Sequence, residues 1–142
     1  PGNSEDVLGA PFEGPAGKLM DSIIAQSVPE SVTYALTNLV ACIPKGDDGV
    51  KTAEPEEESI EACAPRLAEF VRIANPRLIV CVGSLSRDWL DPKRKPSVYA
   101  ISSIPMVNII HPAAILRSNV AQRELSIKKC VVTIANAVRE LR

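Results

Sequence analysis

The sequence predicts an α/β fold, with helices on both faces of a small, mainly parallel sheet. Two short apolar runs, Arg77–Val82 and Met106–Ile110, are typical of buried parallel strands. Segments with helical apolar spacing flank both runs, as expected of strands joined by helical crossovers. A length of 142 residues with 46% hydrophobic residues suits one core. We therefore expect a three-layer α/β/α arrangement with one domain over residues 1–142.

The N-terminal part is expected to hold a loop, a helix and a strand. Residues 1–16 are rich in Gly and Pro and predict a loop. The segment Gly17–Gln26 predicts a short helix, because its apolar residues share one side. The segment Ser31–Val40 carries β-branched and aromatic residues, which favour a strand.

A polar loop and a long helix are predicted next. The stretch from Pro44 to Pro55 is polar and contains glycines and acidic residues. Glu56–Ala74 predicts a helix whose first turn is acidic, which complements the helix dipole. Pro65 lies inside this pattern, so we expect a kink or a later start.

The second half alternates between strands and helices. Ser84–Leu90 predicts a short helix after the first apolar run, and Asp91–Pro96 predicts a basic turn. After the second run, His111 precedes a turn that begins with proline. Val120–Leu141 predicts a long helix, whose apolar side comprises Val120, Ile127, Val131, Ile134 and Val138.

The net charge of −1 hides an asymmetry between the two halves of the chain. Residues 1–75 contain 5 Lys and Arg against 13 Asp and Glu, whereas residues 76–142 contain 11 against 4. The two balances are −8 and +7. A basic half can bind phosphates even in a chain that is neutral as a whole, although solvated helix faces would give the same pattern.

Three residues near expected ligand positions invite a functional interpretation. Asn38 ends a predicted strand, and its amide offers a donor and an acceptor that suit a base edge. His111 is the single histidine, placed at a strand end to donate to a ligand oxygen. Phe12 lies among small residues, where an aromatic ring can stack on a base. A turn asparagine, a structural histidine and a core-capping phenylalanine are the respective alternatives.

The cysteines and apolar runs place limits on location and cofactors. The four cysteines are widely spaced and no signal peptide is visible, so we expect a reduced, cytoplasmic protein. No apolar run is long enough to cross a bilayer, so no membrane partner is expected. Cys42 and Cys63 suit either two ligands of an iron–sulfur site or free thiols. The chain opens at Pro1 without an initiator Met, so we expect it to be truncated at the N-terminus.

Taken in order, five segments resemble the motifs of the uracil-DNA glycosylase superfamily. The likeness is strongest to the iron–sulfur (family-four) branch and its phage-type relatives. Each segment alone is a weak signal, but the ordered set covers nearly the whole chain. The segments are Pro1–Gly17, Thr37–Pro44, Ala62–Leu67, Asn75–Gly83 and His111–Arg117.

The resemblance implies a monomeric repair enzyme of bacterial, archaeal or phage origin. Such enzymes flip uracil out of single- or double-stranded DNA and hydrolyse its N-glycosidic bond. It implies that His111 stabilises the leaving uracil, that Asn38 pairs with the imide edge of uracil and that Phe12 stacks on it. Gly2, Glu5 and Asp6 match further pocket positions.

The resemblance also implies DNA contacts and a cofactor. Leu116 would wedge into the vacated base stack, Arg117 would hold a phosphate, and Lys93-Arg94-Lys95 would face DNA. Cys42 and Cys63 would be two of four ligands of a [4Fe–4S] cluster, with the other pair upstream of Pro1. Alternatives are an inactive DNA-binding or protein-interaction domain of the same fold, and a glycosylase for another deaminated base.

Overall fold

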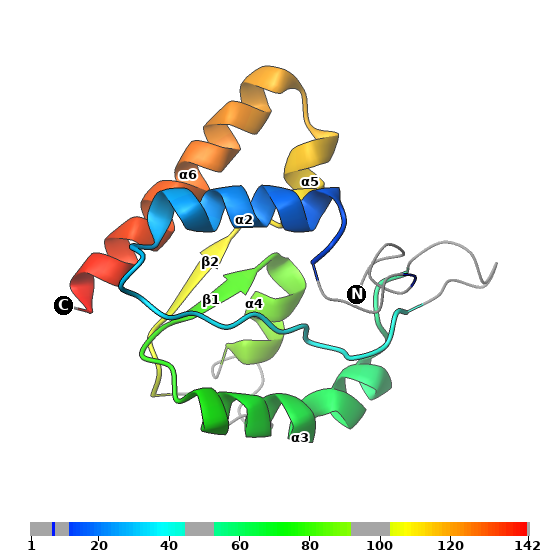
Figure 1. Cartoon of the computed structure of the whole chain (residues 1–142). Coiled ribbons are helices and arrows are strands. Elements are labelled where there is room, and N and C mark those ends of the chain that lie inside the picture. The colour runs from blue at the N-terminus through cyan, green and yellow to red at the C-terminus, as the bar shows by residue number, and fades with distance from the viewer. Residues whose placement is uncertain (1–6, 8–11, 45–52, 92–102, 142) are drawn as a thin grey trace.

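The computed structural model describes residues 7, 12–44, 53–91 and 103–141. Within them, five helices and two strands follow one another along the chain (Figure 1). They are α2 (Pro15–Ser27), α3 (Glu57–Ala74), β1 (Ile79–Val82), α4 (Ser84–Leu90), β2 (Met106–Ile109), α5 (Pro112–Arg117) and α6 (Val120–Glu140).

The two strands form a parallel sheet between two layers of helices. Ile79 pairs with Met106 and Val82 with Ile109, so the carboxyl ends of both strands lie level at one edge. The helices α2, α5 and α6 lie on one side of the sheet, and α3 and α4 lie on the other (Figure 1). The predicted α/β/α fold class is therefore confirmed.

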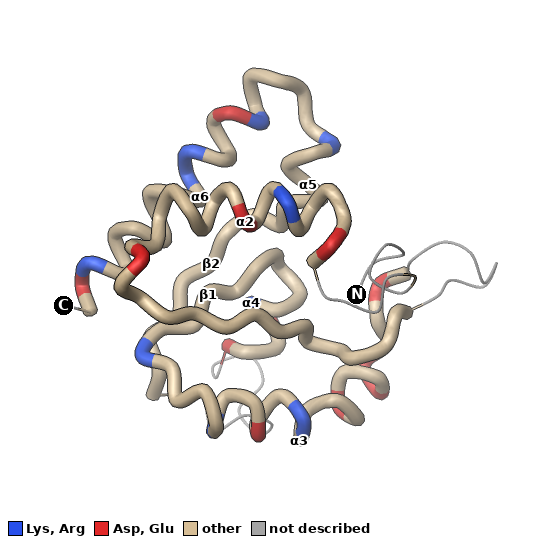
Figure 2. The backbone as a smooth tube through the Cα atoms, in the orientation of Figure 1, with Lys and Arg blue, Asp and Glu red and all other residues tan. Residues whose placement is uncertain are grey.

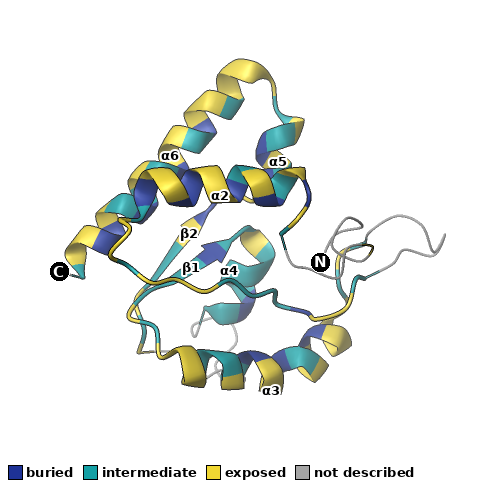
Figure 3. Cartoon of the chain, viewed as in Figure 1, coloured by how far each residue is buried: buried dark blue, intermediate teal, exposed yellow. Residues whose placement is uncertain are grey.

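Buried residues occur in the helices on both sides of the sheet (Figure 3), and most of them are apolar. On one side, the buried stripe of α2 packs against β2, α5 and α6, and Ile23 is fully buried. On the other side, Leu67 of α3 packs near Ile79 and Leu90. The periodic apolar positions of α2 and α6 thus form the main core, which consists of Met20, Ile23, Ile24, Ile109, Ile115, Cys130, Ile134 and Val138.

Most of the predicted elements are confirmed, with differences of one or two residues at their ends. The helix α3 runs from Glu57 through Pro65, so the alternative of a later start is wrong. Val120 was expected on the apolar side of the last helix but is 69% exposed, because it is the first residue of α6 and lies beyond the core. None of the described helices is long and apolar enough to span a membrane.

The predicted strand over Ser31–Val40 is wrong. Residues 33–38 form an extended segment without strand pairing. Its apolar residues still pack inward, since Val32 and Leu36 contact the main core. The backbone carbonyls of Asn38 and Leu39 accept hydrogen bonds from Arg66 of α3 instead of from a neighbouring strand. The β-rich composition therefore predicted a strand where the segment is instead attached to a helix.

The turn expected after His111 is in fact the helix α5. Proline suits a turn, but it also suits the first position of a helix, where no intrahelical partner for an N–H is needed. Pro112 occupies that position, and the residue before it provides the N-cap. Leu116 and Arg117 consequently belong to a helix and not to a loop.

Candidate active site

Gly83 and His111 meet where the two strands end. The Gly83 N–H donates to the carbonyl of Ile109 at 2.9 Å, which carries the parallel pairing one residue beyond β1. Gly83 has a φ of +93°, which side-chain-bearing residues rarely adopt. A Cβ atom at this glycine would lie 3.2 Å from the Cβ of His111. The position thus needs glycine both for its backbone conformation and for its closeness to the imidazole.

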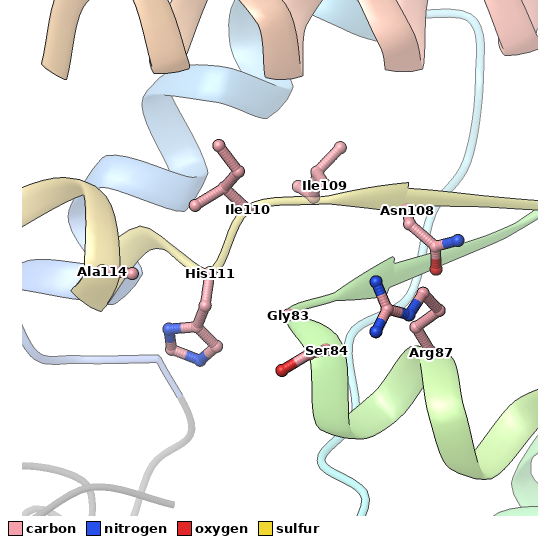
Figure 4. A pocket seen from close by; sticks show the side chains of 8 residues that line it. All are labelled: Gly83, Ser84, Arg87, Asn108, Ile109, Ile110, His111 and Ala114. Carbon is pink, nitrogen blue, oxygen red and sulfur yellow. The ribbon is translucent and has the colours of Figure 1, made fainter. Parts of the chain in front are cut away.

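A cleft of about 420 Å³ opens at this junction. Its volume lies within the range that small-molecule sites occupy, roughly 300–1,000 Å³. The imidazole extends into the space between the start of α5 and the start of α4 (Figure 4). The cleft is lined by Gly83, Ser84, Arg87, Asn108, Ile109, Ile110, His111 and Ala114.

The position of His111 at the N-cap of α5 determines its chemistry. Its Nδ1 accepts a hydrogen bond from the Ala113 N–H at 3.1 Å. A ring nitrogen that accepts carries no proton, so the neutral ring holds its proton on Nε2. Partial removal from water lowers the pKa of His111, and the positive charge of Arg117 lowers it further. At neutral pH this ring is therefore an uncharged donor through Nε2.

Asn38 and Phe12 do not line the described cleft. Asn38 is half-buried in the extended segment, where Arg66 holds its backbone. Phe12 is half-buried before α2 and has a φ of +63°. Its carbonyl oxygen lies against Gly17, where a Cβ would approach it to 1.7 Å. The convergence of these two residues with His111 stays a prediction.

The residues expected to contact DNA are described only in part. Leu116 is half-buried and Arg117 is exposed at the end of α5. Lys and Arg residues recur along α5 and α6, whereas acidic residues gather at the start of α3 (Figure 2). The other expected contacts, Gly2, Glu5, Asp6, Lys93, Arg94 and Lys95, lie outside the described residues.

The two cysteine segments are neighbours in space. The Ala41 N–H donates to the Sγ of Cys63 at 3.4 Å, so Cys63 lies against the residue that precedes Cys42. Cys42 is exposed and Cys63 is half-buried. No group of three or more His, Cys, Asp or Glu that could hold a metal occurs among the described residues. Their role as two of four cluster ligands stays a prediction.

The other two cysteines are core thiols. Cys81 and Cys130 are both buried. Burial raises the pKa of Cys81 to about 11, which keeps it protonated and a poor metal ligand at neutral pH.

Two polar residues of the cleft were missed in the sequence. Asn108 is the one polar residue of β2, and this interruption of an apolar strand is a usable signal. Arg87 lines the cleft from α4 while its Nε donates to Asp88 at 2.7 Å. Nothing in the sequence separates Arg87 from other surface arginines.

Fold and site together define an α/β protein whose ligand cleft opens at the carboxyl ends of parallel strands. A comparison with protein families makes this class specific. The family model of the uracil DNA glycosylase superfamily matches residues 1–135. The chain belongs to this superfamily.

Curated relatives from archaea and from a bacterium are named type-4 uracil-DNA glycosylase. The type-4 uracil-DNA glycosylase of Saccharolobus solfataricus is 33% identical over 105 residues, which is 73% of this chain and 46% of that protein. The type-4 enzyme of Pyrobaculum aerophilum is 32% identical over 131 residues, 82% of this chain and 64% of that protein. That of Thermotoga maritima is 29% identical over 126 residues, 83% of this chain and 63% of that protein. The chain thus spans between about half and two thirds of the length of these relatives.

Proposed function

We propose that this protein excises uracil from DNA by hydrolysing the N-glycosidic bond. The observation that carries the proposal is the neutral His111 imidazole, which extends into a cleft at the strand ends with its proton on Nε2. Membership of the superfamily and the names of the relatives support the same reaction.

The proposed chemistry breaks the bond between the deoxyribose C1′ and uracil N1. The bonding electron pair leaves with uracil, and its negative charge spreads from N1 onto the two carbonyl oxygens. A water molecule adds its hydroxyl to C1′, and the proton that it releases neutralises the uracil anion at N1. The products are free uracil and an abasic site. The Nε2–H of His111 would donate to a uracil oxygen as the charge develops. One such donor is typically worth about 3–4 kcal/mol of transition-state stabilisation.

Base recognition would come from Asn38 and Phe12. The amide of Asn38 would pair with the imide edge of uracil, and cytosine would leave both partners unsatisfied there. The ring of Phe12 would stack on the flipped base. Gly2, Glu5 and Asp6 complete this proposed pocket.

DNA would lie across the basic second half of the chain. Leu116 would occupy the stack that the flipped base leaves, and Arg117 would bind a neighbouring phosphate. Lys93, Arg94 and Lys95 would add phosphate contacts. The exposed position of Arg117, at the opposite end of α5 from His111, supports this assignment.

A [4Fe–4S] cluster would be held by Cys42 and Cys63 together with two further cysteines upstream of Pro1. When bound, such a cluster supplies a metal crosslink between the segments that carry its ligands. The contact between the Ala41 N–H and the Cys63 sulfur supports the pairing of the two segments.

The single domain, the monomeric state and the cytoplasmic location stay predictions.

Uracil release from a uracil-containing oligonucleotide tests the proposal. We expect the intact protein to release uracil and to leave a thymine-containing oligonucleotide unchanged. His111→Ala and Asn38→Ala should each lower the rate by at least about 100-fold, as loss of one such donor does. Asn136→Ala, an exposed asparagine of α6, is the matched control. Salt-dependent DNA binding without any uracil release would replace the enzyme with a DNA-binding domain.

A further inference from the structure

Arg66 of α3 makes a cluster of contacts that neither the fold nor the chemistry above explains. Its Nη1 donates to the Thr37 hydroxyl at 3.1 Å, and its Nη2 donates to the Asn38 carbonyl at 2.5 Å. The same Nη2 lies 3.4 Å from the Leu39 carbonyl. One guanidinium therefore contacts three consecutive residues of the extended segment, almost thirty positions earlier in the chain.

These contacts lie in a part of the chain that has no strand pairing. Thr37, Asn38 and Leu39 belong to no described strand or helix, so a sheet does not fix their backbone. The planar guanidinium presents its donors in a rigid fork, which can set the orientation of neighbouring acceptors. Because the direction of the Asn38 side chain follows from its backbone, a fixed carbonyl at Asn38 also restricts where its amide can point.

A second contact from the same helix holds the same segment. The Sγ of Cys63, three residues before Arg66, accepts from the Ala41 N–H. Thr37 to Ala41 is thus attached to α3 at two points, less than one helical turn apart on the helix. The segment can hardly rotate about one attachment without breaking the other.

We propose that Arg66 is a positioning residue that aims the Asn38 amide at the flipped base. This inference rests on the proposed uracil excision. Arg66 itself is exposed, and hydrogen bonds of exposed side chains add little to stability. Its main effect is on geometry, and displacements on the order of 1 Å in a reactive arrangement can cost about 100-fold in rate.

The first test compares single-turnover uracil release by arginine variants of α3. Arg66→Ala should lower the rate roughly 10- to 100-fold, and Arg66→Lys should recover only part of it because lysine lacks the fork. Arg72→Ala is the matched control, since Arg72 is an exposed arginine on the same helix that pairs with Glu69. We expect its rate to remain within about twofold of wild type, as a weak surface pair implies.

The second test asks whether Arg66 acts through Asn38. In the Asn38→Ala background, Arg66→Ala should change the rate by less than about twofold, because the group to be positioned is already absent. A merely structural role would lower the rate by the same factor in both backgrounds. Backbone ¹⁵N relaxation should show greater motion of the Thr37, Asn38 and Leu39 amides in Arg66→Ala and no change in Arg72→Ala.

The outcomes separate this inference from the proposed function. An active wild type in which Arg66→Ala behaves like Arg72→Ala would overturn the inference alone. Additive effects of Arg66→Ala and Asn38→Ala would overturn it as well. A wild type that releases no uracil would instead overturn the proposed function, and with it any role of Arg66 in that reaction. The relaxation measurement would then still decide whether Arg66 holds the segment.

Discussion

The backbone of Gly83 lies against the side chain of His111, and a Cβ at Gly83 would be 3.2 Å from the Cβ and 3.4 Å from the Cδ2 of that histidine. The two residues follow the ends of neighbouring parallel strands, so the register of β1 against β2 decides this contact. Gly83 thereby forms the wall that limits how far the imidazole can swing toward β1. The contact connects a backbone conformation to the orientation of the proposed catalytic group.

Gly83→Ala should therefore impair the reaction more than it impairs folding. The new methyl group would push the imidazole, while the positive φ of +93° with a ψ of 168° would add roughly 1–3 kcal/mol of strain. We expect at least a tenfold slower release of uracil at a temperature where the variant is still folded. Urea unfolding and single-turnover kinetics on the same preparation measure the two effects. Unchanged kinetics would show that the His111 side chain does not depend on this wall.

His111 has two roles that a pair of substitutions can separate. As the N-cap it accepts from the Ala113 N–H, and as a donor it would serve the leaving base. His111→Ser keeps a capping oxygen, whereas His111→Ala loses it and should cost about 1 kcal/mol of stability. Both variants lack Nε2–H and should be at least about 100-fold slower. If serine restored the activity along with the stability, capping would be the whole role of His111.

The sequence predicted the helices and the two paired strands well, but it failed for the segment Ser31–Val40. The apolar periodicity of α2, α3 and α6 follows from burial of one helix face, which a single chain segment encodes by itself. Whether the segment around Thr37 pairs with a strand depends on a distant residue, Arg66, whose contacts no local pattern reveals.

In the candidate site, too, local sequence patterns revealed some residues, whereas others enter the site only through tertiary packing. His111 was identifiable because a single histidine follows an apolar run and precedes a proline. Its neighbour Gly83 was visible only as the end of a strand, because the positive φ and the closeness of the imidazole arise from strand register. Arg87 enters the cleft through the packing of α4 on β1, which the sequence does not specify.

Titration of the single histidine should contribute to the pH dependence of the free energy of unfolding. Partial removal of the ring from water, together with the charge of Arg117, lowers the pKa of His111 below the ordinary value of 6.5. The unfolded chain therefore binds a proton more readily than the folded protein does. The contribution of His111 to the free energy of unfolding is complete above pH 6.5 and is lost as the pH falls below that value. Urea unfolding between pH 5 and 8 should show a decline toward acid that is smaller in His111→Ser. An equal decline in both proteins would contradict the assignment.

The pH dependence of the reaction follows from the same lowered pKa. The proposed donor is the neutral imidazole, and protonation of Nδ1 would break the hydrogen bond from Ala113. We expect uracil release to persist at pH values slightly below 6.5, where an ordinary histidine is already half protonated. Single-turnover rates across this range are the measurement. An acid limb centred above pH 6.5 would contradict the lowered pKa, whereas a rate that falls as the pH rises through this range would mean that the protonated ring is the active form.

The four thiols should differ in their reactivity toward an aromatic disulfide reagent. At pH 8 in the folded protein Cys81 should resist, because its pKa of about 11 leaves almost no thiolate. Cys42 is exposed and should react first whenever no metal binds it. Absorbance of the released aromatic thiol counts the thiols that react before denaturation and those that react only after it. Cys42→Ser identifies the thiol that reacts fastest. Rapid reaction of the Cys81 thiol in the folded protein would contradict the described core.

Arg123 of α6 should matter for the proposed DNA contact although it lies behind that surface. Its Nη2 donates to the Leu116 carbonyl at 2.8 Å and lies 3.4 Å from the Ser118 carbonyl, so it holds the chain on both sides of Arg117. Arg123→Ala would leave these carbonyls without that donor, and we expect a loss of about 1–3 kcal/mol in stability. DNA affinity should fall as well, because Arg117 would no longer be held in one place.

Lys128→Ala is the matched control, since it removes the same charge from an exposed position of the same helix. Fluorescence anisotropy with a uracil-containing duplex at two salt concentrations measures the affinities, and urea unfolding measures stability. Arg123→Ala should weaken binding at both salt concentrations by a larger factor than Lys128→Ala does, because the control changes only a screened, long-range charge. Equal losses in the two variants would mean that α6 contributes to DNA binding through its charge alone, and that the attachment of α5 to α6 does not orient Arg117.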